Sequence, residues 1–393
     1  MFRIYKYLLR PNKTQDSDLD YLLWQARRVY NTALEQRIMA YDDRKASIKS
    51  SEQWAYFRDL RNSEDETDKL GRLNARVLSN TLRRLDKAFQ AFYRRMKIRK
   101  PDSEKPGYPH FKPRKLFNSI EFSYGNGCSL HQESSSFYVQ NVGQIKVVLH
   151  RVIPKNGVVK MVVVQRKNDR WYANFMVEFE DSERKHSFPR RSVGIDVGIK
   201  SVVALSNKIV IDHPNWLKKS LAELRVLQRK AARQQKGSKR QTATYKKIAK
   251  LHEHVSNQRK DFYHKLSRDI SKKYCIIGIE DLNLSFMNRN KNISRQSYDA
   301  GVGVFRQMLT YKAEEAGGKV IAVNPAYTSQ KCSRCGHKEK KSLAVRVHKC
   351  SNCGLKLSRD VNAAKNIQKL AKAVWKGQPG VKVAIRHALP EKL

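Results

Sequence analysis

The sequence predicts a multidomain α/β protein, and three observations support this class. In the first half, short alternating strands are interrupted by a helical stretch, which is typical of a small β-barrel carrying a helical insertion. In the second half, short apolar strands are interleaved with long helices. Two Cys-x-x-Cys pairs near the C-terminal end predict a zinc ribbon. The 393 residues are enough for about two to four domains.

The chain is strongly basic along its whole length. It has 80 Lys and Arg against 36 Asp and Glu, a net charge of +44. Such a chain repels itself unless a polyanion neutralises it, so nucleic acid is the expected partner. The longest apolar runs suit strands, and neither a membrane span nor a signal peptide is apparent. We therefore expect no membrane partner and a cytoplasmic location, nucleoid-associated when the protein is bound to DNA.

The first half begins with a strand at residues 2–9, where basic and apolar side chains alternate. Apolar positions three and four apart then predict a helix over residues 15–41 and a second over residues 73–98, and we expect these two helices to pack together. Five short strands follow, at residues 119–124, 136–139, 144–149, 158–165 and 171–178. With the first strand they make a small barrel interrupted by a helical insertion.

A connector rich in Pro, Gly and Lys covers residues 97–115. It contains Tyr108, Phe111 and Lys112, two aromatic rings close to a cation. Such rings can stack on nucleic-acid bases, or they can serve only to pin the loop. We favour contact with nucleic acid.

The second half begins with a buried strand at residues 192–195 and its hairpin partner at residues 200–205. Residues 217–273 read as two helical arms broken near Gly237, each with an apolar seam, so they predict a packed helical hairpin. The remaining elements are strands at residues 274–279 and 319–323 and helices at residues 299–316 and 360–375. The hairpin is dense in cations, and those expected to contact nucleic acid are Lys246, Lys250, Arg259 and Lys260.

The two cysteine pairs are Cys332 with Cys335 and Cys350 with Cys353, separated by fourteen residues. A Cys-x-x-Cys turn directs both sulfurs to one side, and two such turns complete the tetrahedron of one structural zinc ion. The alternative is a pair of disulfides or unrelated thiols, which is less favoured because nothing else in the chain indicates an oxidising compartment.

Four other Cys and His residues are not assigned to this site. Four thiolates already fill a structural zinc site, so we expect His337 and His348 to be solvated surface residues. Cys275 lies in an apolar strand and is expected to be a buried, inert thiol. Cys128 sits in a Gly-rich turn and receives no role.

Three carboxylates stand where a nuclease needs them. Asp196 and Glu280 each follow a buried strand, and Asp360 opens the last helix. Taken singly, each has an ordinary explanation as a turn, strand-end or helix-start residue. Taken together in an acid-poor chain, they favour a cluster of hard oxygen ligands that selects Mg²⁺ or Mn²⁺. Two such ions about 3.5–4 Å apart would support in-line hydrolysis of a phosphodiester.

Several stretches of the chain resemble TnpB, a family of transposon-encoded, RNA-guided DNA nucleases. The first three are residues 194–200 (Gly-Ile-Asp-Val-Gly-Ile-Lys), 261–267 (Asp-Phe-Tyr-His-Lys-Leu-Ser) and 279–282 (Ile-Glu-Asp-Leu). The others are residues 327–330 (Tyr-Thr-Ser-Gln), the two cysteine pairs, and residues 359–367 (Arg-Asp-Val-Asn-Ala-Ala-Lys-Asn-Ile). The match is dense from residue 192 to residue 367 and looser before that, where it rests on residues 28–31 and 107–112.

The resemblance implies an RNase H-like RuvC nuclease domain with a zinc-ribbon insert, and an N-terminal wedge β-barrel with a helical recognition insertion. The domains would be the wedge at residues 1–14 and 106–185, the recognition domain at 15–105, the nuclease at 190–330 and 355–376, the insert at 331–354 and a loosely ordered tail at 377–393. Asp196, Glu280 and Asp360 would be catalytic ligands of two Mg²⁺ or Mn²⁺ ions, and Arg359 would contact nucleic acid. Ser358 departs from the acid that many relatives have at this position, which is not a catalytic ligand.

The activity implied is cleavage of double-stranded target DNA beside a short adjacent motif, directed by a guide RNA from the transposon end. We expect a monomer bound to RNA. The alternatives are a nuclease-inactive RNA-guided repressor, a transposase that performs strand transfer, and a compact CRISPR effector. The presence of all three acids argues against the repressor.

Overall fold

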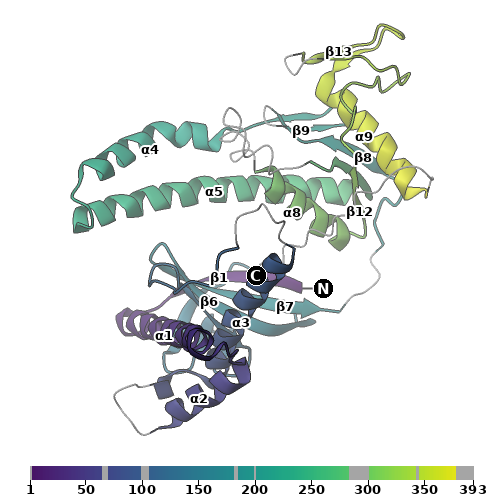
Figure 1. Ribbon diagram of the computed structural model, residues 1–393. Coiled ribbons are helices and arrows are strands. Elements are labelled where there is room, and N and C mark those ends of the chain that lie inside the picture. Colours follow the sequence, from purple (N-terminus) through teal and green to yellow (C-terminus); the bar gives the residue numbers. More distant parts are fainter. Residues whose placement is uncertain are drawn as a thin grey trace. The chain divides into compact units, whose positions relative to one another are not determined.

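The computed structural model describes residues 2–63, 70–98, 106–180, 185–198, 201–282, 301–341 and 345–377. The expected tail at residues 378–393 and the middle of the 97–115 connector lie outside these residues. The chain divides into two compact units, Met1–Asp181 and Ser182–Leu393, and each is considered by itself (Figure 1). Every helix in the described ranges is too short or too polar to cross a bilayer.

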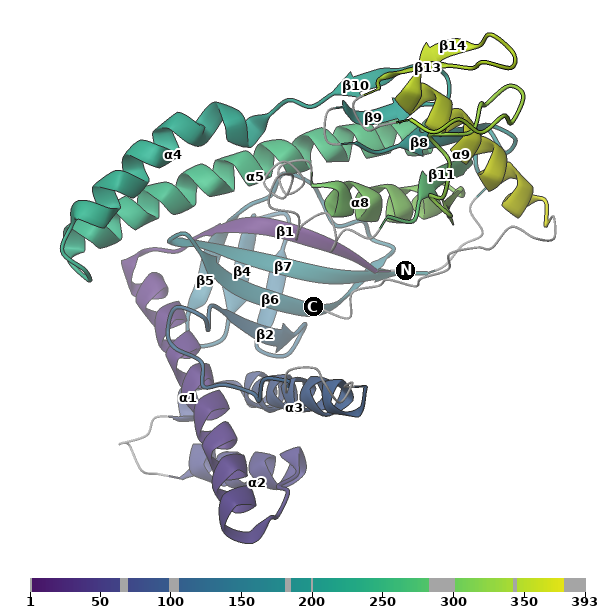
Figure 2. The ribbon, with the colours of Figure 1, turned by 45° about the horizontal axis from the view of Figure 1, so that its top comes forward.

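One antiparallel sheet forms the centre of the first unit (Figure 2). Its spatial order is β2 (Ser119–Ser123), β6 (Gly157–Lys167), β7 (Arg170–Phe179), β1 (Phe2–Arg10), β5 (Gly143–Val148), β4 (Ser136–Val139) and β3 (Cys128–His131). The edge strands β2 and β3 are consecutive in the chain, joined by a tight turn in which the Gly125 N–H donates to the Cys128 carbonyl at 3.1 Å. The sheet must therefore curl until its edges approach each other, which makes a near-closed barrel.

The barrel interior is filled by alternate side chains of the strands, as the period of two requires. Tyr7, Phe137 and Phe175 are among the fully buried side chains. The strands predicted for this half of the chain are confirmed, but β3 was not predicted, because Cys128 was expected to lie in a turn. Cys128 opens this strand instead of lying in a turn, and burial raises the pKa of its thiol to about 12, which makes it inert.

The described part of the first unit contains three α-helices: α1 (Lys13–Arg44), α2 (Ser50–Asn62) and α3 (Ala75–Lys97). The predicted packing of α1 on α3 is confirmed. Helix α2 was not predicted from the sequence, and the residues it buries are Gln53 and Phe57. Gln53 donates to the Ala33 carbonyl at 2.7 Å and accepts from Arg37 at 2.7 Å. Because polar contacts attach α2, apolar periodicity does not reveal it.

The second unit contains a mixed five-stranded sheet in the order β10 (Val210–Asp212), β9 (Ser201–Leu205), β8 (Ser192–Asp196), β11 (Ile276–Glu280) and β12 (Lys319–Val323). The pairs β8–β11 and β11–β12 are parallel and the other two are antiparallel. Four of the strands were predicted. The short strand β10 was not, because its three residues are largely exposed and carry no alternating pattern.

Helices cover both faces of this sheet. The predicted hairpin is confirmed as α4 (Trp216–Arg233) and α5 (Lys239–Lys273), and with α8 (Val302–Glu315) it supplies the core on one face (Figure 2). Helix α9 (Arg359–Trp375) packs on the other face. In β11, Ile277 and Ile279 face α5 and α8, whereas Ile276 packs with α9. The strand period of two therefore sends Glu280 to the face covered by α9.

Helix α9 packs closely on the sheet because two paired glycines lie beneath it. Gly194 of β8 and Gly278 of β11 are register partners. A Cβ on Gly194 would stand 1.9 Å from the Ala364 carbonyl oxygen, and one on Gly278 would stand 2.8 Å from the Ala371 Cβ. Only glycine leaves room for the helix at this distance.

Candidate active site and zinc centre

Three carboxylates meet on the α9 face of the second sheet. Asp196 is the last residue of β8 and Glu280 the last of β11. These strands are parallel neighbours, and Ile195 pairs with Ile279, so both acids emerge at the same edge. Asp360 lies in the first turn of α9, and its charge acts on Asp196. The fold thus brings together acids that are up to 164 positions apart in the chain (360 − 196).

Polar side chains hold two of these carboxylates. The Ser201 hydroxyl donates to Asp360 at 3.3 Å, and the Thr328 hydroxyl donates to Glu280. Asp281, next in the chain, is excluded from the cluster because it forms an ion pair with Arg306 at 3.1 Å. The neighbouring acid thus has a structural partner of its own.

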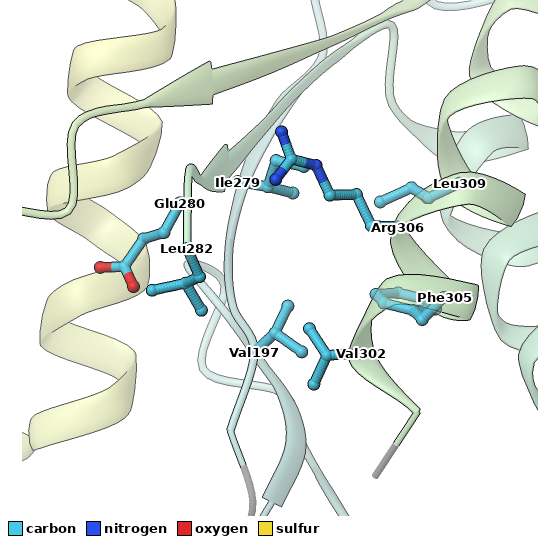
Figure 3. A pocket seen from close by; sticks show the side chains of 8 residues that line it. All are labelled: Val197, Ile279, Glu280, Leu282, Val302, Phe305, Arg306 and Leu309. Carbon is cyan, nitrogen blue, oxygen red and sulfur yellow. The ribbon is translucent and has the colours of Figure 1, made fainter. Parts of the chain in front are cut away.

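Figure 3 shows a pocket between the end of β11 and helix α8. The carboxylate of Glu280 points toward α9, whereas Ile279 points to the other side of the strand. The pocket is lined by two charged residues, Glu280 and Arg306, and by six apolar ones: Val197, Ile279, Leu282, Val302, Phe305 and Leu309. The pocket is therefore mainly apolar, and it reaches the strand end that carries Glu280.

Burial and mutual repulsion disfavour ionisation of the clustered carboxyl groups. Burial, followed by the charges of Glu280 and Asp360, raises the pKa of Asp196 to about 8. Burial also raises the pKa of Glu280, although the Thr328 hydroxyl and Arg359 oppose the shift. Full ionisation therefore needs cations, and three carboxylates are the oxygen ligands that Mg²⁺ or Mn²⁺ prefers. The three side chains thus have the donor chemistry expected for these ions, although among the described residues only the four cysteines have ligand atoms clustered within 4.8 Å.

We expect Asp196→Asn to stabilise the metal-free protein. Asp196 has a pKa near 3.8 when unfolded and about 8 when folded, so the unfolded chain loses its proton first and wild-type stability falls as pH rises from about 4 to 8. In chelator, the variant should melt about 4–8 °C higher near pH 8 and show little difference near pH 4, consistent with ~2 kcal/mol. Thermal melts across this pH range measure the gap. A gap that does not change with pH would contradict the expectation.

The four cysteine sulfurs also converge. All lie within 4.8 Å of one another, and Cys332–Cys353 and Cys335–Cys350 are each 3.6 Å apart. A disulfide needs about 2.05 Å, whereas a tetrahedron with Zn–S bonds of about 2.3 Å places sulfurs a little under 4 Å apart. The sulfurs have the spacing of a four-thiolate zinc site and not of two disulfides.

The two Cys-x-x-Cys turns have matching backbones. Gly336 N–H donates to the Cys332 carbonyl at 2.9 Å, and Gly354 N–H donates to the Cys350 carbonyl at 3.0 Å. Both glycines have positive φ, +79° and +70°, which other residues adopt at a cost. The turns therefore direct each sulfur pair to one side, as expected for zinc.

The thiols differ in acidity. The His337 backbone N–H lowers the pKa of Cys335 to about 6. The Leu355 backbone N–H lowers the pKa of Cys353, but burial and the neighbouring sulfurs outweigh it and raise that pKa to about 12. Four neighbouring thiolates repel one another, so a cation is needed to ionise the whole set.

One expectation near the zinc site is wrong. His337 is exposed, as expected, but His348 is completely buried instead of solvated. Its Nδ1 lies 2.8 Å from the Lys341 ammonium, and burial lowers its pKa. His348 belongs to the short hairpin of β13 (Val347–Lys349) and β14 (Lys356–Ser358), whose packing the sequence pattern did not show.

The residues expected to contact nucleic acid differ in their surroundings. Tyr108 stacks edge-on against Phe89 and Phe92 of α3, with ring centroids 5.4 and 5.2 Å away, which is the loop-pinning arrangement. Phe111 is exposed, whereas the Lys112 backbone N–H donates to the Asn31 side chain at 2.8 Å. Nucleic-acid contact by this loop stays a prediction.

The cations of the helical hairpin are accessible on α5. Lys246, Lys250 and Lys260 are exposed, and Arg259 is half-buried. Lys246 and Lys250 are four residues apart, so they share one side of the helix. Arg359 is half-buried beside the acids, and its charge lowers the pKa of both Asp196 and Glu280.

Four polar residues around the site were not singled out as functional from the sequence: Ser201, Thr328, Asn362 and Asn366. Thr328 and both asparagines lie inside matched motifs, and the asparagines are four residues apart on a helix. That spacing was the available signal. Their partners, however, come from other segments of the chain.

Comparison with known proteins identifies three matching family models. Residues 174–291 match a family model described as "Probable transposase" (OrfB, IS605), and residues 303–367 match the "Cas12f1-like, TNB domain" model. Residues 1–46 match a model described as a helix-turn-helix domain, although here they form strand β1 and helix α1.

Two relatives and one structure illustrate the similarity. "Putative RNA-guided DNA endonuclease InsQ" of Escherichia coli (strain K12) is 30% identical over 387 residues, covering 94% of this chain and 92% of InsQ. "CRISPR-associated endodeoxyribonuclease Cas12f1" of Sulfoacidibacillus thermotolerans is 25% identical over 327 residues, covering 75% and 77%. A Cas12f1–sgRNA–target DNA structure aligns with a TM-score of 0.58 at 18% identity, over 91% of this chain and 83% of that one. The near-complete match to InsQ and the family models show that the chain belongs to the TnpB/IS605 family.

Proposed function

We propose that this chain is an RNA-guided DNA endonuclease that cuts double-stranded DNA beside a short adjacent motif. The observation that carries the proposal is the convergence of Asp196, Glu280 and Asp360 at one edge of the second sheet. Relatives named as RNA-guided DNA endonucleases support it. The net charge of +44 supplies the attraction that RNA and DNA backbones require.

The proposed reaction is hydrolysis of a phosphodiester in an RuvC-like site. Two Mg²⁺ or Mn²⁺ ions held by the three carboxylates would supply activation of a water and stabilisation of the leaving oxygen. The chain supplies the ligands, keeps Asp281 apart from them, and orients Glu280 and Asp360 through the Thr328 and Ser201 hydroxyls. The zinc at the four cysteines is proposed to be structural, since its four thiolates leave no open position for catalysis.

The proposed division of labour follows the sequence boundaries given above. Residues 1–14 and 106–185 would be the wedge and residues 15–105 the recognition domain. Residues 190–330 and 355–376 would be the nuclease and residues 331–354 the zinc insert. The active species is proposed to be a cytoplasmic complex of one chain with one guide RNA.

The test starts from purified protein with its copurifying RNA, which is sequenced to identify the guide. The complex is incubated with linear duplexes that carry the matching target and randomised flanks. We expect cleavage of one subset of flanks in Mg²⁺ and none in chelator. Binding without cleavage in Mg²⁺ would indicate a repressor, and joined transposon ends would indicate a transposase; either result would overturn the proposal.

A further inference from the structure

A short segment connects the two metal centres of the second unit. Residues 328–333, the bridging segment, contain Thr328 at one end and Cys332 near the other. The buried Thr328 hydroxyl lies within hydrogen-bonding distance of the Glu280 carboxylate and of the Pro325 carbonyl, the latter at 3.0 Å, and its single proton can be donated to either oxygen. Cys332 is one of the four clustered sulfurs. One segment thus touches a carboxylate of the candidate active site and supplies a ligand of the zinc site.

Two asparagines of helix α9 form hydrogen bonds with this segment. The fully buried Asn362 accepts from the Ser333 N–H at 2.9 Å and donates to the Lys331 carbonyl at 2.8 Å. Asn366 donates to the carbonyls of Thr328 and Lys331, both at 2.8 Å. A side-chain amide that pairs with backbone groups fixes both position and direction, because donor and acceptor are distinct.

A third residue on the same side of the helix also forms a hydrogen bond with the segment. The Lys369 ammonium donates to the Ser333 carbonyl at 2.6 Å. Positions 362, 366 and 369 are four and three residues apart, so they lie on one helix face. This helix also carries Asp360, two residues before Asn362. Any shift of the bridging segment is therefore passed both to Glu280, through Thr328, and to the helix that presents Asp360.

We propose that the bridging segment, with Asn362 and Asn366, couples zinc binding at the four cysteines to the geometry of the Mg²⁺-binding carboxylates. The inference rests on the proposed function for the identity of the carboxylate site. Zinc anchors Cys332, the asparagines hold the segment against α9, and Thr328 sets the direction of the Glu280 carboxylate. Thr328 contacts the proposed ligand Glu280, whereas Asn362 and Asn366 act on it through the backbone of the bridging segment, so all three are positioning residues in this scheme. Outer partners of metal ligands typically affect metal affinity about 10–100-fold.

The first test measures Mn²⁺ binding to the full-length, zinc-loaded, RNA-free protein by electron paramagnetic resonance. Thr328→Val keeps the shape of the side chain and removes the donor, so we expect about tenfold weaker Mn²⁺ binding. Thr328→Ser keeps the hydroxyl and should restore binding to within about twofold of wild type. Asn366→Ala should weaken it by several-fold. Lys372→Ala, an exposed position on the same helix, is the matched control and should bind as wild type does.

The second test asks whether zinc acts through the segment. The double variant Cys335→Ser/Cys353→Ser cannot form a four-thiolate site, and elemental analysis should give about one zinc for wild type and none for this variant. We expect it to weaken Mn²⁺ binding about tenfold when Thr328 is present and less than about threefold when position 328 is already valine. Such non-additivity is the signature of coupled positions.

The outcomes separate this inference from the proposed function. If Thr328→Val binds Mn²⁺ as wild type does, or if zinc loss has the same effect with threonine and with valine, the coupling is overturned. If the wild type does not bind Mn²⁺, or if Asp196→Asn does not abolish the binding, the proposed carboxylate site itself is wrong. Because Thr328→Val leaves the zinc site intact, the coupling stays testable even if the cysteine variant does not fold.

Discussion

Replacing Asp196 with alanine is expected to lower Mg²⁺-dependent DNA cleavage by at least about 10³-fold, because a metal ion contributes several kcal/mol to the transition state and each 1.4 kcal/mol is about tenfold in rate. The charges of Glu280 and Asp360 both raise the pKa of Asp196, so Asp196 interacts with each of the other two acids. Its loss should therefore empty the shared site. Cleavage rates of wild type and variant, measured with the same copurified RNA, test this.

The matched control for this experiment is Asp281→Asn. Asp281 is the next acid in the chain after Glu280, but it is paired with Arg306 at 3.1 Å. We expect the control to lose some stability and to retain cleavage within about tenfold, because the residue contacts no proposed metal ligand. RNA-guided DNA binding by Asp196→Ala should equal that of wild type. Unchanged cleavage by Asp196→Ala would show that the chemistry lies elsewhere.

Replacing Gly194 with alanine is expected to have the largest effect on stability. The new Cβ would stand 1.9 Å from the Ala364 carbonyl oxygen and 2.5 Å from the Gln368 backbone nitrogen. Backbone atoms cannot swing aside as a flexible side chain can, so α9 must move as a unit. We expect a loss of ~3 kcal/mol, which lowers the melting temperature of a unit of this size by about 6–12 °C.

The displacement of α9 should also separate Asp360 from the two strand-end acids. Mn²⁺ binding should therefore weaken by at least about tenfold, even at temperatures where the variant is folded. Gly71→Ala is the matched control, because the nearest atom to its added Cβ is 3.5 Å away, an ordinary contact. It should change stability by less than about 0.5 kcal/mol. A Gly194→Ala protein that melts with wild type would show that α9 is free to shift outward without cost.

The two metal centres have different chemical characters. The proposed zinc ligands are four soft thiolates, whereas the proposed active-site ligands are three hard carboxylates. Removal of Mg²⁺ is expected to stop cleavage reversibly. Removal of zinc is expected to alter the structure that holds Glu280 and α9. In the proposed scheme, the bridging segment links the two centres within this chain.

Much of the molecule could be read from local patterns. Helical and strand periods located most elements, and the cysteine spacing predicted the zinc turns, because a Cys-x-x-Cys turn is a local structure. The three acids were also recognised, since each follows a strand or opens a helix whose type was legible. Local patterns did not predict β3, because its edge position and short length leave almost no periodic signal. They also did not predict α2, because polar contacts anchor this helix.

The active site was decided only by packing between distant segments. The alternation of β8 and β11 sends Asp196 and Glu280 to one face, but Gly194 and Gly278 determine how closely α9 brings Asp360 to them. Asn362 and Asn366 likewise form hydrogen bonds with the backbone of residues 328–333. No periodic pattern in the sequence predicts these pairings. Chain order and residue type therefore identified the candidate metal ligands, while close contact across the sheet and helix set their geometry. The physical reason is that side-chain direction repeats along a strand or helix, whereas the approach of two elements depends on the volumes of residues from both.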